Sequence, residues 1–120
     1  VTVLTSLSEG ELHAELGIAE SLTAHVARLT ALAADSGLNG VVCSAHEAGA
    51  VKAAHGRDFL TITPGIRPAG SATDDQTRTM TPAAALHAGS DYLVIGRPVT
   101  RAAKPAIALA DIIASIAQGE

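Results

Sequence analysis

Two arginines and a glycine carry the clearest chemical signal in the sequence. Gly96 and Arg97 directly follow an apolar run, and Arg67 lies within the string Thr-Pro-Gly-Ile-Arg-Pro at residues 63–68. A glycine lets a backbone amide approach an anion closely, and the planar guanidinium of arginine fits two phosphate oxygens at once. The two segments together therefore predict a phosphate-binding site.

Four short apolar segments, each followed by small or polar residues, are predicted to be the strands that position this site. They lie near residues 1–5, 40–44, 59–63 and 92–96. Their Val, Ile and Leu content without regular alternation is typical of a parallel sheet that is covered on both faces.

Signals for helix starts and stops lie between these segments. Ser8 with Glu11, and Ser44 with Glu47, have the spacing of capping boxes. Further starts are predicted at Ser21, at Thr81-Pro82 and after Lys104-Pro105, with stops at Gly37, Gly56 and Gly89. The chain is therefore expected to repeat a strand and a helix four times.

An open doubly wound sheet and a closed barrel of parallel strands both fit this order. Polar or special residues follow every predicted strand, at Thr5, Ser44, Pro64 and Gly96. This favours the barrel, whose functional face lies at the carboxyl ends of its strands. We expect an α/β fold that is half of a (β/α)8 TIM barrel, because a complete barrel has about 250 residues. Val1 opens inside a predicted strand, so we expect a truncated chain whose barrel is closed by homodimerisation or by a missing N-terminal half.

Composition narrows the range of partners for this single domain. The net charge of -4 offers no basic field for a nucleic-acid backbone, so nucleic acid is not expected as a partner. No apolar stretch approaches the roughly 18 residues of a membrane span, so no membrane partner is expected either. Cys43 is the one cysteine and lies in an apolar run, which fits a reducing compartment and predicts a cytoplasmic protein.

Residues 64–80 show neither a helical nor a strand period. Loops of this length are uncommon inside a compact domain and often serve as functional lids, so we expect a mobile phosphate clamp. Asp74 and Asp75 within it are expected to be solvated, because a polar run on a loop usually faces water.

Taken in order and spacing, these motifs resemble the C-terminal half of the orotidine 5′-phosphate decarboxylase family. The matching strings are residues 1–6, 40–45, 63–68, 75–76 and 94–97. The resemblance implies strands five to eight of a (β/α)8 barrel, with no metal and no organic cofactor. It implies decarboxylation of orotidine monophosphate (OMP) to uridine monophosphate (UMP), a step of pyrimidine biosynthesis, with free phosphate or sulfate as smaller ligands.

The resemblance also implies five ligand-binding residues and one residue of the pocket wall. They are Arg97 and the Gly96 amide for the 5′-phosphate, Arg67 beside that phosphate, Gln76 between phosphate and pyrimidine, Thr5 at the pyrimidine edge, and Pro64 in the pocket wall. An amide side chain suits the position of Gln76, because it donates and accepts hydrogen bonds at once.

One departure from the family pattern is expected to decide activity. The family's Asp-x-Lys-x-x-Asp motif has no counterpart here, where the lysines are Lys52 and Lys104. No catalytic residue is therefore assigned, and the chain alone is expected not to turn over. Two alternatives stay open: a non-catalytic, self-associating half-barrel scaffold, and a fragment of another phosphosugar-binding TIM-barrel enzyme.

Overall fold

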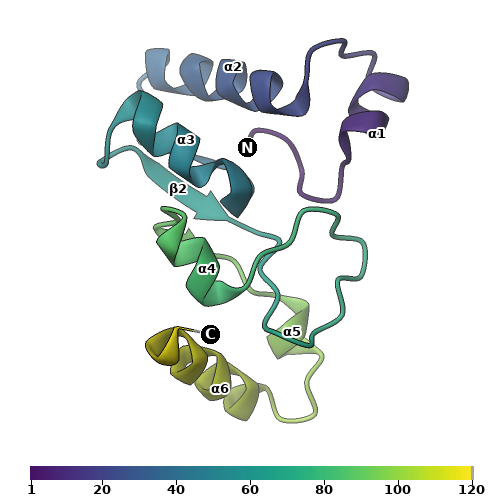
Figure 1. The fold of residues 1–120 in the computed structure, drawn as a ribbon, viewed down its shortest axis with the longest axis vertical. Coiled ribbons are helices and arrows are strands. Elements are labelled where there is room, and N and C mark those ends of the chain that lie inside the picture. Colours follow the sequence, from purple (N-terminus) through teal and green to yellow (C-terminus); the bar gives the residue numbers. More distant parts are fainter. Residues whose placement is uncertain (120) are drawn as a thin grey trace.

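A computed structural model describes residues 1–119, which form six helices and three strands. In chain order the elements are α1 (Glu9–Ala14), α2 (Leu22–Asp35), β1 (Gly40–Val42), α3 (Ala45–His55), β2 (Leu60–Thr63), α4 (Pro82–His87), β3 (Tyr92–Leu93), α5 (Arg97–Thr100) and α6 (Pro105–Gln118). Helices α2, α3, α4 and α6 follow one another along the long axis of the molecule, as Figure 1 shows. No helix in the described part of the chain is long and apolar enough to cross a membrane.

The three strands form one parallel sheet in the order β1-β2-β3. Val41 pairs with Thr61, and Ile62 pairs with Tyr92. Each strand lies inside one of the predicted segments, and a helix connects each strand to the next. The predicted parallel α/β class is therefore confirmed.

The prediction of a strand over residues 1–5 is wrong, because this segment has no strand structure. It does run beside β1, since the Thr2 amide and hydroxyl both donate to the Val42 carbonyl oxygen, at 3.0 and 2.8 Å. Both donors reach the same acceptor, so no ladder of alternating bonds extends along the segment.

Side-chain caps mark where the first four helices, α1 to α4, begin. Both predicted capping boxes are present, on Ser8 with Glu11 and on Ser44 with Glu47. The hydroxyls of Ser21 and Thr81 cap α2 and α4 as expected. The sequence does not predict the short helix α5, which begins at Arg97 without a side-chain cap.

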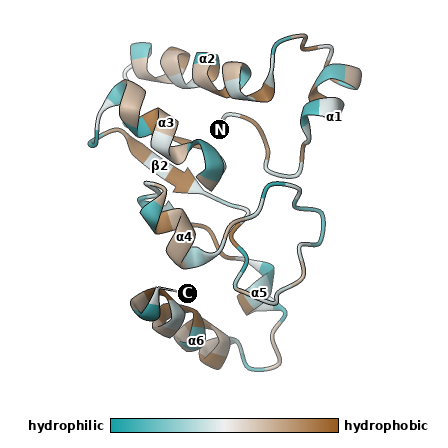
Figure 2. Cartoon of the chain, in the orientation of Figure 1, coloured by the Kyte–Doolittle hydropathy of each residue, from teal (hydrophilic) through white to brown (hydrophobic). Residues whose placement is uncertain are grey.

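Helices cover one face of the sheet and leave the other face open. Thr61 and Thr63 on β2 are fully buried toward the helices, whereas Leu60 and Ile62 on the opposite face are 36% exposed. The expectation that the strands are covered on both faces is therefore wrong for this chain. The reason is geometric: all the connecting helices pack on the same side, and no described segment covers the other. Figure 2 shows apolar residues on β2 and along α6.

Candidate anion-binding site

The loop of residues 64–80 leaves the carboxyl end of β2 and is closed at its base by backbone pairing. The Arg67 amide donates to the Met80 carbonyl at 3.0 Å, and the Met80 amide donates to the Gly65 carbonyl at 3.2 Å. Ile66 and Met80 accordingly form a parallel bridge. This closure holds both arms of the loop at the end of the sheet where the predicted site residues lie.

Thr5 joins the first segment of the chain to this loop. Its side-chain hydroxyl donates to Gln76 Oε1. Its carbonyl oxygen accepts from the Thr77 amide at 3.2 Å, the Arg78 amide at 3.3 Å and the Thr77 hydroxyl at 3.1 Å. Two of the predicted site residues, Thr5 and Gln76, are thus in direct contact, and Thr5 is only 4% exposed.

Arg67 is buried within the loop and braces its backbone. Its Nε donates to the Ala72 carbonyl and its Nη1 to the Ile66 carbonyl, both at 3.0 Å. Its remaining nitrogen, Nη2, lies 3.8 Å from Asp74 Oδ2. Two of the three guanidinium nitrogens therefore bond to the loop backbone, and the third, Nη2, faces Asp74.

Arg97 is the first residue of α5, directly after Gly96, and it faces the same acidic pair. Its Nε lies 3.5 Å from Asp74 Oδ2, and its Nη2 donates to Asp75 Oδ1. The hydrogen bond from Arg97 lowers the pKa of Asp75. Both aspartates are exposed to solvent, as predicted, and they also form ion pairs that the sequence does not indicate: Asp74 lies beside Arg67 and Arg97, and Asp75 beside Arg97.

The space around Gly96 and Arg97 is accessible. A Cβ placed on Gly96 would have no heavy atom within 4 Å, so the space on that side of its Cα is open. A hollow of about 250 Å³ is bordered by Asp74, Arg97 and Arg101. Pro64 stands one residue beyond β2 and is half-buried at the start of the loop. The arrangement offers open cationic groups to an anion, in competition with carboxylates.

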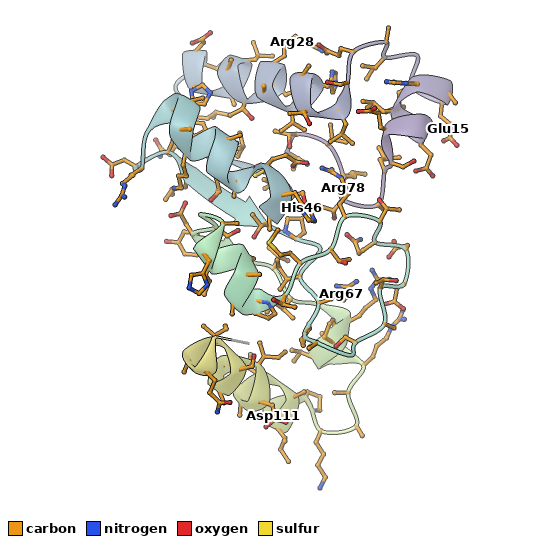
Figure 3. All side chains as sticks on the ribbon, viewed as in Figure 1. Glu15, Arg28, His46, Arg67, Arg78 and Asp111 are labelled. Carbon is orange, nitrogen blue, oxygen red and sulfur yellow. The ribbon has the colours of Figure 1, made fainter. Side chains whose placement is uncertain are left out.

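A separate ion pair joins Arg78 and Glu47, and the sequence does not predict it. Arg78 Nη1 donates to Glu47 Oε1, and Arg78 Nη2 donates to the Val3 and Leu4 carbonyls, each at 3.2 Å. Glu47 is 8% exposed, and burial raises the pKa of its carboxyl although Arg78 opposes the shift. The capping-box spacing identified Glu47, but no spacing in the sequence links it to Arg78. Figure 3 shows Arg78 near the amino end of α3 and Arg67 lower in the view.

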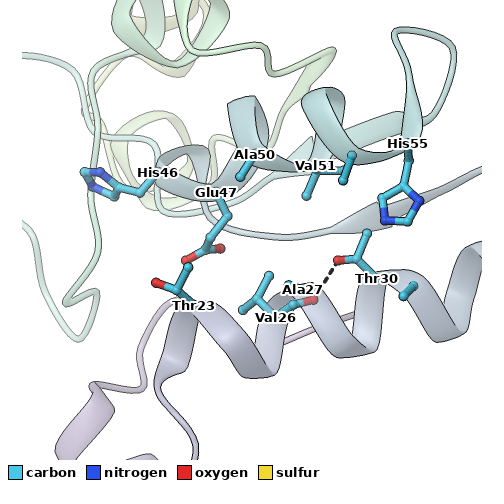
Figure 4. A pocket seen from close by; sticks show the side chains of 11 residues that line it. Thr23, Val26, Ala27, Thr30, His46, Glu47, Ala50, Val51 and His55 are labelled. Carbon is cyan, nitrogen blue, oxygen red and sulfur yellow. Dashed lines mark hydrogen bonds between the residues drawn. The ribbon is translucent and has the colours of Figure 1, made fainter.

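The space between α2 and α3 has different chemistry. It is a hollow of about 420 Å³ walled mainly by small and apolar side chains such as Val26, Ala27 and Val51. Figure 4 shows Glu47 and His46 at one end of this hollow and His55 at the other. An apolar wall with a carboxylate does not suit an anion. Within residues 1–119, no group of three or more His, Cys, Asp or Glu side chains is placed to hold a metal ion.

Comparison with known proteins places this arrangement in a family. The model of the orotidine 5′-phosphate decarboxylase / HUMPS family matches residues 1–112. The chain belongs to this family. Among curated members named orotidine 5′-phosphate decarboxylase, that of Chromobacterium violaceum is 64% identical over 91% of this chain and 44% of its own length. That of Teredinibacter turnerae is 57% identical over 97% of this chain and 50% of its own length.

Two solved structures share the fold of this chain. An orotidine 5′-phosphate decarboxylase from Lactobacillus acidophilus aligns with a TM-score of 0.76 and 36% identity, over 96% of this chain and 46% of that chain. A conserved protein from Geobacillus kaustophilus aligns with a TM-score of 0.72 and 43% identity, over the same shares. The chain thus spans about half the length of the relatives that it matches.

Proposed function

We propose that this chain is the phosphate- and nucleotide-binding half of a cytoplasmic orotidine 5′-phosphate decarboxylase. The observation that carries the proposal is the convergence of Arg67 and Arg97 on Asp74, within the loop that also brings Gln76 to Thr5. The 5′-phosphate of OMP or UMP replaces the carboxylates beside Arg97 and accepts from the Gly96 amide. Gln76 and Thr5 then lie toward the pyrimidine.

The proposed half binds nucleotide but does not turn it over alone. Decarboxylation at C6 requires a positioned acid that delivers a proton to the carbanion, and the Asp-x-Lys-x-x-Asp motif is absent from these 120 residues. Binding energy at the phosphate assists catalysis only when the reacting end is also complete. These residues therefore bind and orient the nucleotide, and the complementary half supplies the acid.

The open face of the sheet supports the half-barrel part of the proposal. Leu60 and Ile62 are 36% exposed there, and Tyr92 and Val94 next to them are 59% and 47% exposed. Contiguous apolar surface of this kind marks a surface that is covered in the assembled molecule. The covering element is the complementary half of a (β/α)8 TIM barrel, which completes the sheet and buries these side chains.

The first test measures UMP binding to the 120-residue chain by calorimetry. Arg97→Met should weaken binding by about 10- to 100-fold, because a charge-assisted hydrogen bond to the dianion is lost. Arg57→Gln, an exposed arginine in the turn before β2, is the matched control and should bind like the wild type. Equal affinity of all three proteins, or no binding by the wild type, would refute the proposed site.

The second test measures OMP turnover. The chain alone should show none, and activity should appear when it is mixed with the portion of the Chromobacterium violaceum relative that it does not match. Full activity of the chain alone would refute its assignment as a half that lacks the acid. No activity in a mixture that forms a complex would refute the assignment as a complementing half.

The second candidate function is a self-associating, non-catalytic half-barrel. The same exposed apolar face favours it, because a second copy can cover that face around a twofold axis. Light scattering on the purified chain separates the two readings. A stable homodimer that the complementary half fails to displace supports the scaffold, and a heterodimer formed at the expense of the homodimer supports the decarboxylase half.

A further inference from the structure

The ion pair between Arg78 and Glu47 has no role in the proposed grip on phosphate, yet it adjoins the contact between Thr5 and Gln76. We infer that Arg78, held by Glu47, is a positioning residue that sets Thr5 and Gln76 for the nucleoside part of the ligand. This inference rests on the proposed nucleotide-binding function. Arg78 acts through its neighbours and does not itself touch the ligand.

The guanidinium of Arg78 ties three separate segments together. It donates to Glu47 on α3 and to the Val3 and Leu4 carbonyls of the first segment, while its own backbone belongs to the returning arm of the loop. Arg78 Nε is buried without a hydrogen-bond partner among the described residues, a cost that the charged contacts offset. One side chain therefore fixes the loop against both α3 and residues 3–4.

Glu47 is a firm anchor for this tie. Its Oε2 accepts the Ser44 amide at 2.7 Å in the capping box that begins α3, which leaves Oε1 for Arg78. His46 adds a second link, since its Nε2 donates to the Thr79 carbonyl at 3.0 Å. The start of α3 therefore holds two consecutive residues of the loop's returning arm.

Arg78 is also linked directly to the two proposed ligand contacts, Thr5 and Gln76. The Arg78 amide donates to the carbonyl of Thr5, whose hydroxyl donates to Gln76, two residues before Arg78. The opposite arm of the loop packs just as closely, because a Cβ on Gly65 would lie 2.8 Å from the Arg78 carbonyl oxygen. A shift of Arg78 must therefore move Thr5, Gln76 or both.

Arg97 stands outside this network, which gives a selective prediction. Its partners are Asp74 and Asp75, near the tip of the loop, and its backbone begins α5. A ligand held mainly at Arg97 should be insensitive to Arg78, whereas a ligand that also needs Thr5 and Gln76 should be sensitive. Inorganic phosphate and UMP are two probes of these kinds.

The experiment measures the affinities of the full chain for UMP and for inorganic phosphate, by NMR titration, in the wild type, Arg78→Gln and Arg78→Lys. Arg78→Gln should weaken the binding of UMP about tenfold and the binding of phosphate less than about twofold. A tenfold loss is the change expected when one well-placed polar contact is removed. Arg78→Lys should restore at least half of the loss on a logarithmic scale, because an ammonium can still donate to Glu47 and to a carbonyl. Arg57→Gln should change neither affinity.

If Arg78 had a purely structural role, Arg78→Gln would weaken the binding of both ligands equally or unfold the chain. Equal weakening of UMP and phosphate binding would overturn the inference, and so would an unchanged UMP affinity. Amide hydrogen exchange without ligand provides a separate readout. Arg78→Gln, or Arg78→Lys if the first variant does not fold, should speed hydrogen exchange at the backbone amides of positions 77 and 78. Exchange in α6 should be unchanged. If the wild type binds no UMP, the proposed function fails, and unchanged exchange at these two amides then overturns the positioning role as well.

Discussion

Thr5 and Gln76 are 71 positions apart in the chain, and the hydroxyl of Thr5 donates to the side-chain oxygen of Gln76. Together with the three donors that the Thr5 carbonyl accepts, this contact binds the first segment to the loop of residues 64–80. The loop is therefore anchored at its returning arm, while its acidic tip lies against Arg97. Four predictions follow from this arrangement of the loop and from the packing of the residues around it.

Removing the charge of Asp75 should strengthen anion binding. Asp75 accepts from Arg97, so phosphate must displace this carboxylate before it can use the same donor. Asp75→Asn should raise the affinity for inorganic phosphate roughly two- to fivefold, in the range of an exposed ion pair. NMR titration measures the effect, and Asp58→Asn, an exposed aspartate before β2, serves as control.

The pH dependence of this effect has a definite sign. Arg97 lowers the pKa of Asp75, so the carboxylate stays charged between pH 5 and 8, and the ratio of variant to wild-type affinity should be constant there. Below about pH 4 the wild type should approach the variant as Asp75 becomes neutral. A variant that binds phosphate more weakly than the wild type would show that Asp75 assists the site.

Asp91 should stabilise the fold in a pH-dependent way. Its Oδ2 accepts from Lys52 Nζ at 2.5 Å and from the Thr61 amide at 2.7 Å. Burial raises the pKa of Asp91, but the hydrogen bonds from Lys52 and Thr61 outweigh it and lower the pKa overall. Asp91→Asn should cost about 1 to 2 kcal/mol in urea unfolding at pH 7, because the carboxylate is partly in water.

Because the pKa of Asp91 is lowered on folding, its contribution is complete above the ordinary pKa of an aspartate and is lost as the pH falls through the lower folded value. The difference between wild type and Asp91→Asn should therefore be constant from pH 5 to 8 and shrink below about pH 4. Asp111→Asn on α6 is the control. A difference that grows in acid would contradict the assignment.

Alanine substitutions at Gly65 and Gly70 should distinguish the cost of backbone strain from the cost of close packing. Both have positive φ, 77° and 76°, but only Gly65 has a neighbour, since its added Cβ would lie 2.8 Å from the Arg78 carbonyl oxygen. Gly70→Ala should cost about 1 to 2 kcal/mol in urea unfolding, the cost of the left-handed backbone alone. Gly65→Ala should cost at least about 1 kcal/mol more. Equal costs would show that the two arms of the loop are not in contact.

Cys43 should resist alkylation in the folded chain. Burial, followed by the nearby charge of Glu47, raises the pKa of its thiol to about 12, and the side chain is 1% exposed. Only the thiolate reacts, so at pH 8 iodoacetamide should modify the native chain at least about a hundredfold more slowly than the chain in urea. Similar rates in the two conditions would contradict the buried placement.

The sequence was most informative where structure depends on neighbouring residues. A cap joins residues three positions apart, so Ser8 with Glu11 and Ser44 with Glu47 could be read directly. The strand predicted at residues 1–5 does not form, although the segment runs beside β1. Strand formation depends on a ladder of hydrogen bonds to a distant segment, which the residues of the strand itself do not reveal. Arg78 was missed for the same reason, since its partner Glu47 lies 31 positions away in the sequence.

The sequence by itself determined where five of the six described helices begin, the parallel α/β class and, through its motifs, the family. Tertiary structure alone decided that Arg67 braces the loop, that Asp74 and Asp75 face the arginines, and that one face of the sheet stays open. The physical reason is range: propensities and caps act within a turn or two of chain. Ion pairs and burial depend on which distant segments the fold brings together.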